Sequence, residues 1–513
     1  MAGTWQMQQK RSSASDFPPP SVIHNIDTKL VCQEKQNPNS PRPQEVHLTR
    51  SIQATSVADS SVAVPTWLKI QQWAARAHAS EWGFATAAYQ IEGPVAKDGR
   101  GISIWDTFCH LEPSRTKGAS GDIACDHHHQ YEEDFDLLSK YGAKAYRFSV
   151  SWSRTIPQGG RNDPLNEQGV SFYSRLIDSL VKGGITPCVT LYHWDLPQGL
   201  HDRHGGWLDV QESQLDFERY ARSAGRHAPG RSGTNDLSEA GNSATEPWIA
   251  GEAQILSHVR AGIAYNKEFK PSQAGQIGIS LTGDYYEPWD STDSRDKEAA
   301  KRRIKLHIGW FANAIFLETD YPSCMRGQLG HRLPIVTEAE FGLLNEAEID
   351  FYGMNYYTSQ FGRHGEGHVP DTDYVGNLDE LQHNKQGTPV GEKSAIHWLR
   401  SCPGLFRKHL TRIYSLYGKP ICITENGCPC PGEDSMACKE AVDDAYRIKY
   451  FNSHLDSICK SIVDDGAVTK GFFAWAHLGE FSTISQDPVV HQPKNGLMDM
   501  AHVSASHSLI TRP

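Results

Sequence analysis

Lys419-Pro420-Ile421-Cys422-Ile423-Thr424-Glu425-Asn426-Gly427 is an apolar run that ends in a carboxylate, an amide and a glycine. Apolar and β-branched residues in succession, with a proline before them and a glycine after them, predict a buried strand over Pro420–Thr424. Parallel sheets carry their reactive side chains at the carboxyl ends of the strands. Glu425 is therefore the first candidate for a reactive group in this chain.

Six further runs have the length and composition expected of buried strands: Gly83–Ala87, Ala145–Val150, Pro187–Tyr192, Gln276–Leu281, Asp350–Asn355 and Lys470–Trp475. Amphipathic helical segments alternate with them, namely Tyr131–Lys140, Gly169–Lys182, Val210–Ala224, Ile249–Phe269, Lys297–Phe316 and Ala445–Asp464. This alternation predicts βαβ units and a parallel sheet. We therefore expect an α/β fold of the TIM (β/α)8 type, in which one strand is missing.

The gap lies where the fourth strand of the barrel is due. From Gly225 to Thr245 the chain stays polar, and beyond Trp475 no helical apolar period is found, so the last helix is missing too. The sequence predicts a disordered extension over residues 1–64, a barrel over 65–475 and an atypical tail over 476–513. A lost strand should leave two strand edges unpaired or force a distorted closure of seven strands.

Composition argues against several classes of partner. The chain has 513 residues and a net charge of −11 with no basic block, which argues against nucleic acid. No window approaches the ~20 consecutive apolar residues that span a bilayer, so a membrane partner is not expected. Residues 1–40 do not resemble a secretory signal, and the 11 cysteines are an odd number, so we expect reduced thiols in the cytoplasm. The oligomeric state stays open.

Two clusters of metal-ligand residue types are interpreted as structural. His127, His128 and His129 are consecutive, and consecutive helical residues point about 100° apart, so they cannot converge on one ion. Cys428, Cys430 and Cys438 lack the two-residue spacing of zinc sites, and no later pair completes such a site. We therefore expect no metal.

Polar and aromatic residues gather at the predicted strand ends: Gln90, Arg147, His193, Trp194, Asn355, Tyr357, Glu425 and Trp475. A single aromatic residue at a strand end is usually core filling. Several such ends together suit a ring that bears many hydroxyls, because each hydroxyl needs a polar partner and the C–H face needs an apolar platform. These residues are interpreted as a candidate sugar site.

The motifs at these strand ends resemble glycoside hydrolase family 1, in particular fungal intracellular β-glucosidases. The resemblance extends from Trp82 to Trp475 and is carried by Trp82–Gly93, Tyr146–Ser149, Tyr192–Pro197, Asn355–Ser359 and Thr424–Gly427. It implies a retaining glycosidase that takes small-molecule O-linked β-glucosides of the cellobiose or aryl type and uses no cofactor.

The resemblance also implies a role for each strand-end residue. Glu425 is the expected nucleophile, held ionised by Arg147 and oriented by Tyr357. The remaining residues are expected to bind the sugar: Gln90, His193, Trp194, Asn355 and Trp475.

The family pattern breaks where the proton donor belongs. A retaining glycosidase needs a second carboxyl about 5–5.5 Å from the first, and the family carries it in an Asn-Glu-Pro motif on the fourth strand. Glu246 in Thr245-Glu246-Pro247 is interpreted instead as a helix start, and Glu287 in Tyr286-Glu287-Pro288 as a similar false match. Impaired activity is therefore expected. A non-catalytic or misassembled sugar-binding barrel is the alternative, and a thioglucosidase is a third option.

Overall fold

The computed structural model describes residues 81–111, 116, 118–225, 242–436, 441, 444–476 and 505–511. The predicted extension over residues 1–64 lies outside these ranges. So do most of the predicted gap over 225–245 and, apart from residue 476 and residues 505–511, the predicted tail over 476–513.

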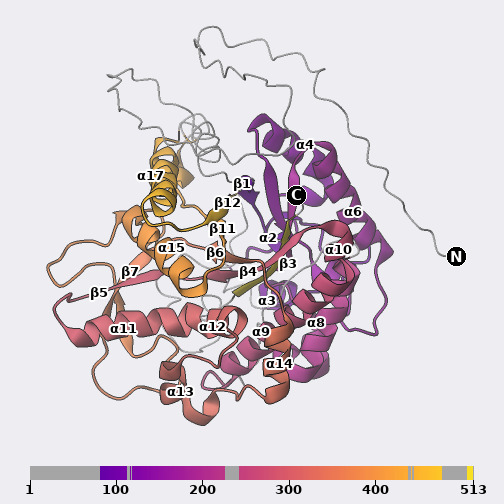
Figure 1. Ribbon diagram of the computed structural model, residues 1–513. Helices are drawn as coiled ribbons and strands as arrows, with labels where there is room; N and C mark the ends of the chain where they lie inside the picture. Colours follow the sequence, from indigo (N-terminus) through magenta and orange to yellow (C-terminus); the bar gives the residue numbers. More distant parts are fainter. Residues whose placement is uncertain are drawn as a thin grey trace, which may run out of the picture. The chain divides into compact units, whose positions relative to one another are not determined.

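Seven parallel strands form most of a barrel, and each confirms one of the seven predicted strands (Figure 1). They are β1 (Glu81–Ala85), β2 (Ala145–Ser149), β3 (Thr186–Tyr192), β4 (Gln276–Thr282), β6 (Phe351–Asn355), β11 (Ile421–Asn426) and β12 (Thr469–Trp475). The strand order is a closed ring, β1-β12-β11-β6-β4-β13-β3-β2. All seven therefore point their carboxyl ends toward the same mouth of the barrel.

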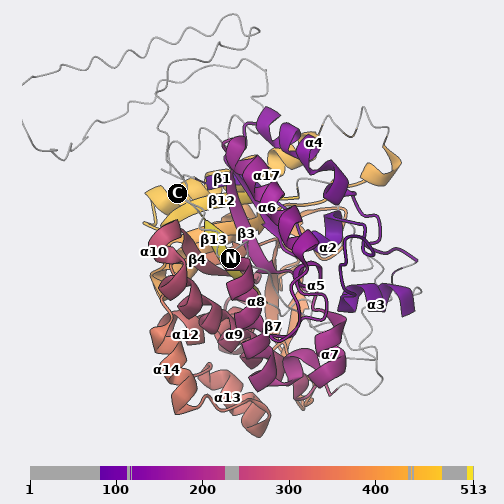
Figure 2. The same ribbon diagram turned by 90° about the vertical axis from the view of Figure 1, so that its right-hand side faces the viewer.

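The eighth strand, β13 (Ala505–Thr511), comes from the predicted tail and runs antiparallel to both of its neighbours (Figure 2). Leu509 pairs with Thr190 of β3 and with Gly278 of β4. In the described ranges no parallel strand lies between β3 and β4, as the sequence predicts. The expectation of unpaired edges or of a seven-strand closure is corrected, because the backbone of β13 pairs with both edges.

The predicted helices are confirmed to within a few residues. They are α4 (His127–Lys140), α6 (Glu167–Lys182), α8 (Val210–Gly225), α9 (Glu246–Glu268) and α17 (Ala445–Val463), which lie outside the strands (Figures 1 and 2). The segment predicted over Lys297–Phe316 is continuous but not uniform. It consists of α11 (Ser294–Ile304), a π-helical turn η2 (Lys305–Gly309) and α12 (Trp310–Leu317).

The structure has further elements that the sequence does not predict, most of them short. The helices among them are α2 (Ala88–Ile91), α3 (Ile104–Leu111), α5 (Trp152–Thr155), α7 (Gln198–His204), α10 (Lys270–Gln273), α13 (Ser323–Leu329), α14 (Glu338–Glu346) and α15 (Pro403–Tyr417). The 3-10 turns are η1 (Gly206–Leu208), η3 (Gly330–Arg332) and η4 (Glu433–Ser435). Beside the barrel, β5 (Tyr285–Pro288), β7 (Ser359–His364) and β8 (Leu378–Leu381) form a three-stranded sheet, and β9 (Glu392–Lys393) pairs with β10 (Arg400–Ser401).

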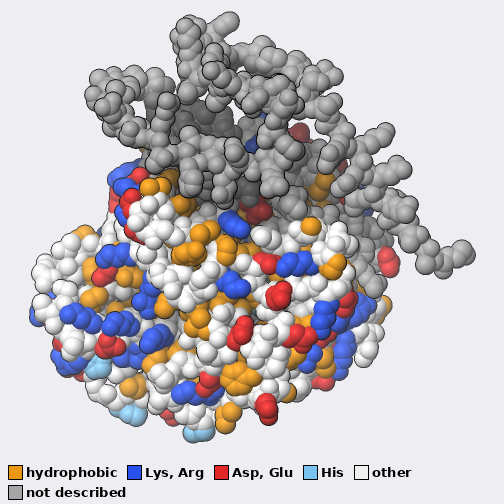
Figure 3. Space-filling model, viewed as in Figure 1, with side chains coloured by type: hydrophobic (Ala, Val, Ile, Leu, Met, Phe, Trp, Pro, Cys, Tyr) orange, Lys and Arg blue, Asp and Glu red, His pale blue; other side chains and the backbone are white. Residues whose placement is uncertain are grey.

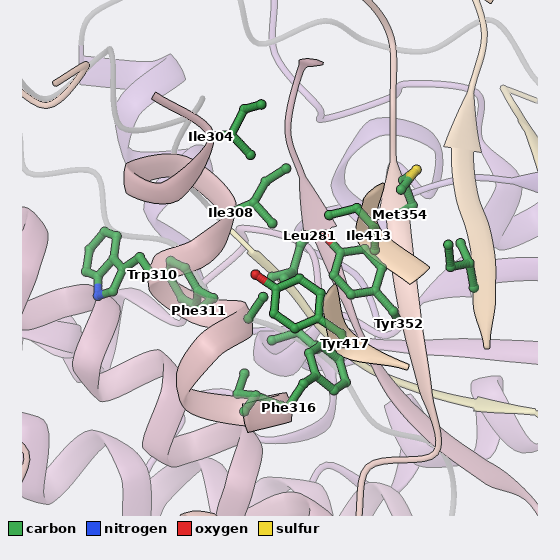
Figure 4. Close-up of a cluster of buried hydrophobic side chains, with 14 of the residues drawn as sticks. Leu281, Ile304, Ile308, Trp310, Phe311, Phe316, Tyr352, Met354, Ile413 and Tyr417 are labelled. Atoms are coloured by element: carbon green, nitrogen blue, oxygen red, sulfur yellow. The ribbon is translucent and has the colours of Figure 1, made fainter. Parts of the chain in front are cut away.

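Alternation along the strands divides the core into two layers. Small and aromatic side chains fill the inside of the barrel: Ala85, Ala145, Cys188, Phe351, Cys422 and Phe473. The next residue along β6, Tyr352, belongs to the outer cluster, where it packs with Phe316 and Tyr417 between strand and helices (Figure 4). Each large apolar side chain that is fully buried on either face stabilises the fold by roughly 1.5–3 kcal/mol. This burial fixes the inward and outward alternation along each strand, and the alternation determines which residues face the mouth.

The surface in Figure 3 has basic and acidic side chains interspersed over its described part. None of the helices in the described ranges has the length and apolar content needed to cross a bilayer.

Candidate active site

A bulge in β11 turns Glu425 toward the mouth of the barrel. Cys422 faces the barrel interior and Ile423 belongs to the outer cluster, so strict alternation would point Glu425 outward. The register shifts on both sides of β11, between Ile423 and Asn426 against β12 and between Ile423 and Glu425 against β6. A bulge re-aims a side chain in this way. As a result, Thr424 and Glu425 both reach partners on the inner face.

Both oxygens of the Glu425 carboxylate are held by donors from other parts of the barrel, Arg147 in β2 and Tyr357 just after β6. Arg147 donates from Nη1 to Oε1 at 2.6 Å, and the Tyr357 hydroxyl donates to Oε2 at 2.6 Å. The His193 Nε2 lies 4.0 Å from Oε1. Glu425 is 4% exposed and Arg147 is 0% exposed, so the ion pair is shielded from water. A carboxylate held at both oxygens has a fixed orientation.

Two threonines that the sequence analysis missed hold this arrangement in place. Thr190 of β3 accepts from Arg147 Nε at 3.0 Å, and the Thr424 carbonyl accepts from Arg147 Nη1 at 3.1 Å. The Thr424 hydroxyl donates to Asn355 Oδ1 at 2.6 Å. A threonine inside an apolar strand run was the available signal, since a buried hydroxyl needs a partner.

Aromatic rings line the mouth beside Glu425. The His193 and Trp475 rings stack, with centroids 5.5 Å apart and an interplanar angle of 17°, and the His193 and Trp194 centroids are also 5.5 Å apart. Gln90 lies in α2, just after β1, and is partly exposed. Contacts within the described residues join Glu425 to Arg147, Tyr357 and His193, and His193 to Trp194 and Trp475. Asn355 is joined to this group through Thr424.

Two other carboxyls near the strand ends have raised pKa values. Asp284 follows β4, and burial together with Glu380 raises its pKa to about 7, while Gln360 of the three-stranded sheet hydrogen-bonds to it. Asp195 follows β3, and burial raises its pKa to about 7 in spite of the Arg100 charge. Arg147 and Tyr357, the two groups that hold Glu425, therefore stand apart from the residues that shift these two pKa values.

Of the two glutamates that imitate the missing motif, one lies at the predicted helix start and the other in a strand that the sequence does not predict. Glu246 is the first residue of α9, with Thr245 at the N-cap and a proline in the first turn. Glu287 lies in β5 and pairs with Lys408. The three consecutive histidines each pair with a different aspartate, namely Asp134, Asp98 and Asp126, so they share no centre.

The family model for glycosyl hydrolase family 1 matches residues 78–225 and 223–498. The two matched segments meet at residues 223–225, where the predicted gap in place of the fourth strand begins. The second piece extends beyond Trp475, at which the resemblance in individual motifs ends.

Individual relatives agree with this match. Beta-glucosidase 1B of Phanerodontia chrysosporium is 42% identical over 427 residues, which cover 78% of this chain and 78% of the relative. The crystal structure of the β-glucosidase from Trichoderma harzianum has a TM-score of 0.76 at 43% identity, covering 79% of this chain and 90% of that chain. The Humicola insolens β-glucosidase in complex with glucose has a TM-score of 0.75 at 42% identity, covering 79% and 91%.

Proposed function

Because the chain belongs to glycosyl hydrolase family 1, we propose that it acts on O-linked β-glucosides by double displacement, with Glu425 as the nucleophile. The relatives support a glycoside hydrolase that acts on β-glucosides, and a Humicola insolens relative has been solved in complex with glucose. The observation that carries the proposal is a buried carboxylate at the barrel mouth, held at both oxygens by Arg147 and Tyr357.

The proposed chemistry has two displacements at the sugar C1. A Glu425 oxygen attacks C1 as the aglycone oxygen leaves with the electron pair of the broken bond, which gives a covalent glucosyl ester. Water then attacks the same carbon and the carboxylate leaves, so the configuration is retained. Trp475, His193 and Trp194 provide the apolar platform and hydrogen-bonding groups for the ring, with Asn355 and Gln90 at its edge.

We propose that the missing fourth strand weakens this activity. The expected general acid is absent from the sequence, and the Asp284 carboxyl is hydrogen-bonded by Gln360. Loss of a general acid costs roughly 10²–10⁴ in rate for a poor leaving group, but much less for one that leaves as a stable anion. Cellobiose should therefore be cleaved slowly or not at all, and an activated aryl glucoside faster.

Azide is expected to rescue turnover of an activated aryl glucoside. Azide is already an anion, so it can attack C1 of the glucosyl ester without a general base, and the product is β-glucosyl azide. Steady-state release of dinitrophenol with and without azide, with the sugar product identified by mass spectrometry, measures this.

Cellobiose serves as the internal control, because azide cannot assist the departure of a sugar alcohol in the first displacement. Rapid cellobiose cleavage without azide would show that a second carboxyl is present and would refute the proposed impairment. Calorimetric binding of glucose with no turnover of either substrate would favour the alternative, a barrel that binds sugar without catalysis.

Tyr357→Phe should lower kcat/KM for the aryl glucoside roughly 10-fold to 100-fold. The variant removes one of the two donors to Glu425, and a hydrogen bond to a charged group is worth about 1.5–3 kcal/mol. Tyr446→Phe is the matched control, because Tyr446 packs on the same cluster as Tyr357 but its hydroxyl donates to the Lys393 carbonyl instead of to Glu425. Equal kcat/KM values for the two variants would contradict a role for Tyr357 in orienting the nucleophile.

A further inference from the structure

Asn426 directly follows the proposed nucleophile in the chain, and its side chain is fully buried. Its exposed fraction is 0%, as is that of Tyr356, which lies just after β6. Asn426 Nδ2 donates to the Tyr356 carbonyl at 2.9 Å and to the hydroxyl of Tyr450, in α17, at 2.9 Å. Each of the two amide hydrogens of Asn426 therefore has its own acceptor.

These two acceptors require a side-chain amide at this position. A backbone carbonyl can only accept, so the nitrogen of Asn426 and not its oxygen must face Tyr356. An aspartate of the same shape has no hydrogen to donate to that carbonyl when it is ionised. An alanine would remove both hydrogen bonds from a buried carbonyl and a buried hydroxyl.

The bond from Asn426 to Tyr356 supports the strand pair where the bulge interrupts it. The register of β11 against β6 shifts between Ile423 and Glu425, and a bulge disrupts the ladder of backbone hydrogen bonds. Beyond this shift, the Tyr356 amide donates to the Glu425 carbonyl at 3.0 Å. Two successive residues of β11 therefore hold the backbone of Tyr356, one at its amide and one at its carbonyl.

Holding the Tyr356 carbonyl also holds the start of Tyr357. The carbonyl belongs to the same planar peptide unit as the Tyr357 amide, so fixing its direction limits the rotation of that unit. At the other end of the residue, the Tyr357 hydroxyl donates to Glu425 Oε2 at 2.6 Å. The contacts thus form a closed path from Asn426 through Tyr356 and Tyr357 back to Glu425.

Tyr450 joins the same amide to the layer of helices around the barrel. Its side chain is buried, and its ring stacks on His454 with centroids 4.0 Å apart and an interplanar angle of 26°. It shares an apolar cluster with Leu399 and Cys428, and Tyr357 packs against this cluster. A ring packed in this way gives Asn426 an acceptor in a fixed place.

We propose that Asn426 is a positioning residue, which holds the Tyr356–Tyr357 segment against the bulge of β11 and so places the Tyr357 hydroxyl on the nucleophile. The inference rests on the proposed function for its kinetic readout. Misplacing a group in an active site by about 1 Å can lower the rate on the order of 10²-fold. A buried side chain that does not line the barrel mouth is therefore expected to control the first displacement.

Asn426→Ala should lower kcat/KM for the dinitrophenyl glucoside about tenfold to 100-fold, because the Tyr357 hydroxyl loses its fixed position. The dissociation constant for glucose, measured by titration calorimetry, should change by less than about twofold, because the variant alters the chemical step and not sugar binding. Tyr450→Phe removes one of the two acceptors and should lower kcat/KM about threefold to tenfold.

Asn166→Ala is the matched control, because the Asn166 amide also donates twice, to the carbonyls of Asp98 and Arg154 at 2.7 and 2.8 Å. Asn166 lies at the N-cap of α6 and should leave kcat/KM at the parental value. An equal loss of kcat/KM in Asn166→Ala and Asn426→Ala would overturn the inference, since it would show a general effect of losing a buried amide.

A double-mutant cycle with Tyr357→Phe tests whether Asn426 acts through Tyr357. When Tyr357→Phe is already present, Asn426→Ala should lower kcat/KM by less than about threefold, because the hydroxyl that it positions is gone. The same full loss in both backgrounds would overturn the inference. If Asn426→Ala does not fold, Tyr450→Phe replaces it in the cycle, and its effect should disappear in the Tyr357→Phe background.

Amide hydrogen exchange at Tyr356 in the full chain provides a readout that does not depend on catalysis. Asn426→Ala should lower the protection factor of the Tyr356 amide at least about tenfold. The Tyr352 amide, which donates to the Pro420 carbonyl at 2.9 Å in the same pair of strands, should keep its protection. Unchanged protection at Tyr356, or an equal loss at both amides, would overturn the inference.

The two readouts also separate this inference from the proposed function. If the parent turns over neither glucoside, the proposed function fails, and hydrogen exchange at Tyr356 still decides whether Asn426 holds the segment. Turnover in the parent together with parental kcat/KM in a folded Asn426→Ala variant would overturn the inference and leave the proposed function intact.

Discussion

A fluorinated glucoside with a dinitrophenyl leaving group should label the chain at one residue, Glu425. Fluorine next to C1 slows both displacements, while the good leaving group keeps the first fast enough to form the glucosyl ester. Glu425→Gln should abolish the label and lower turnover of the aryl glucoside at least about 10³-fold, because the amide is not a nucleophile at C1. Intact-mass and peptide mass spectrometry measure the label.

Glutamine is preferred to alanine at this position for a physical reason. Alanine would remove the side-chain oxygen that accepts from the buried Arg147, and breaking a buried pair in this way costs about 3–5 kcal/mol, whereas glutamine keeps an oxygen within reach. Glu287→Gln and Glu246→Gln are the controls, since both glutamates imitate the missing motif by sequence alone. Label on either of them, or parental turnover in a well-folded Glu425→Gln variant, would end the proposal for Glu425.

Leu509→Pro should destabilise the barrel by about 3 kcal/mol or more. Proline has no amide hydrogen, and Leu509 pairs on one side with Thr190 and on the other with Gly278, so it lies in a strand with two neighbours. A chain that ends at residue 476 should lose more, because both β3 and β4 then present an unpaired edge. Urea denaturation followed by circular dichroism measures the free energy of unfolding.

Leu509→Ala is the control for the loss of the leucine side chain, because both variants lack that side chain but alanine keeps the amide hydrogen that proline removes. The proline variant should be the less stable of the two. Light scattering adds a second measurement, since open strand edges promote association. If the chain ending at residue 476 unfolds at the same urea concentration as the parent, β13 does not contribute to the barrel.

The sequence predicts the seven parallel strands well because a strand buried on both faces is a continuous apolar run. The same rule misses β5, β7 and β8, which are short and partly exposed. It also misses β13, whose residues 505–511 are Ala-Ser-His-Ser-Leu-Ile-Thr, with only three of the seven typical of a strand interior. The pairing of β13 depends on two edges distant in the chain, and no local pattern encodes such a partner.

The candidate site also combines residues that local sequence patterns predict with features that they do not. Glu425, Arg147 and Tyr357 could be named from motifs, because each motif ends a recognisable strand. The bulge that turns Glu425 inward could not, because it is visible only in the register of β11 against β6 and β12.

The placement of β13 has a consequence for how the molecule is made. Ribosomes release a chain from its amino end at roughly 5–20 residues per second, and most α/β barrels can pair each strand with an earlier one as it emerges. Here β3 and β4 pair with β13, which is synthesised after every other strand of the barrel. The barrel can close only after β13 has left the ribosome, and until then β3 and β4 present open edges that promote binding by chaperones or by other nascent chains.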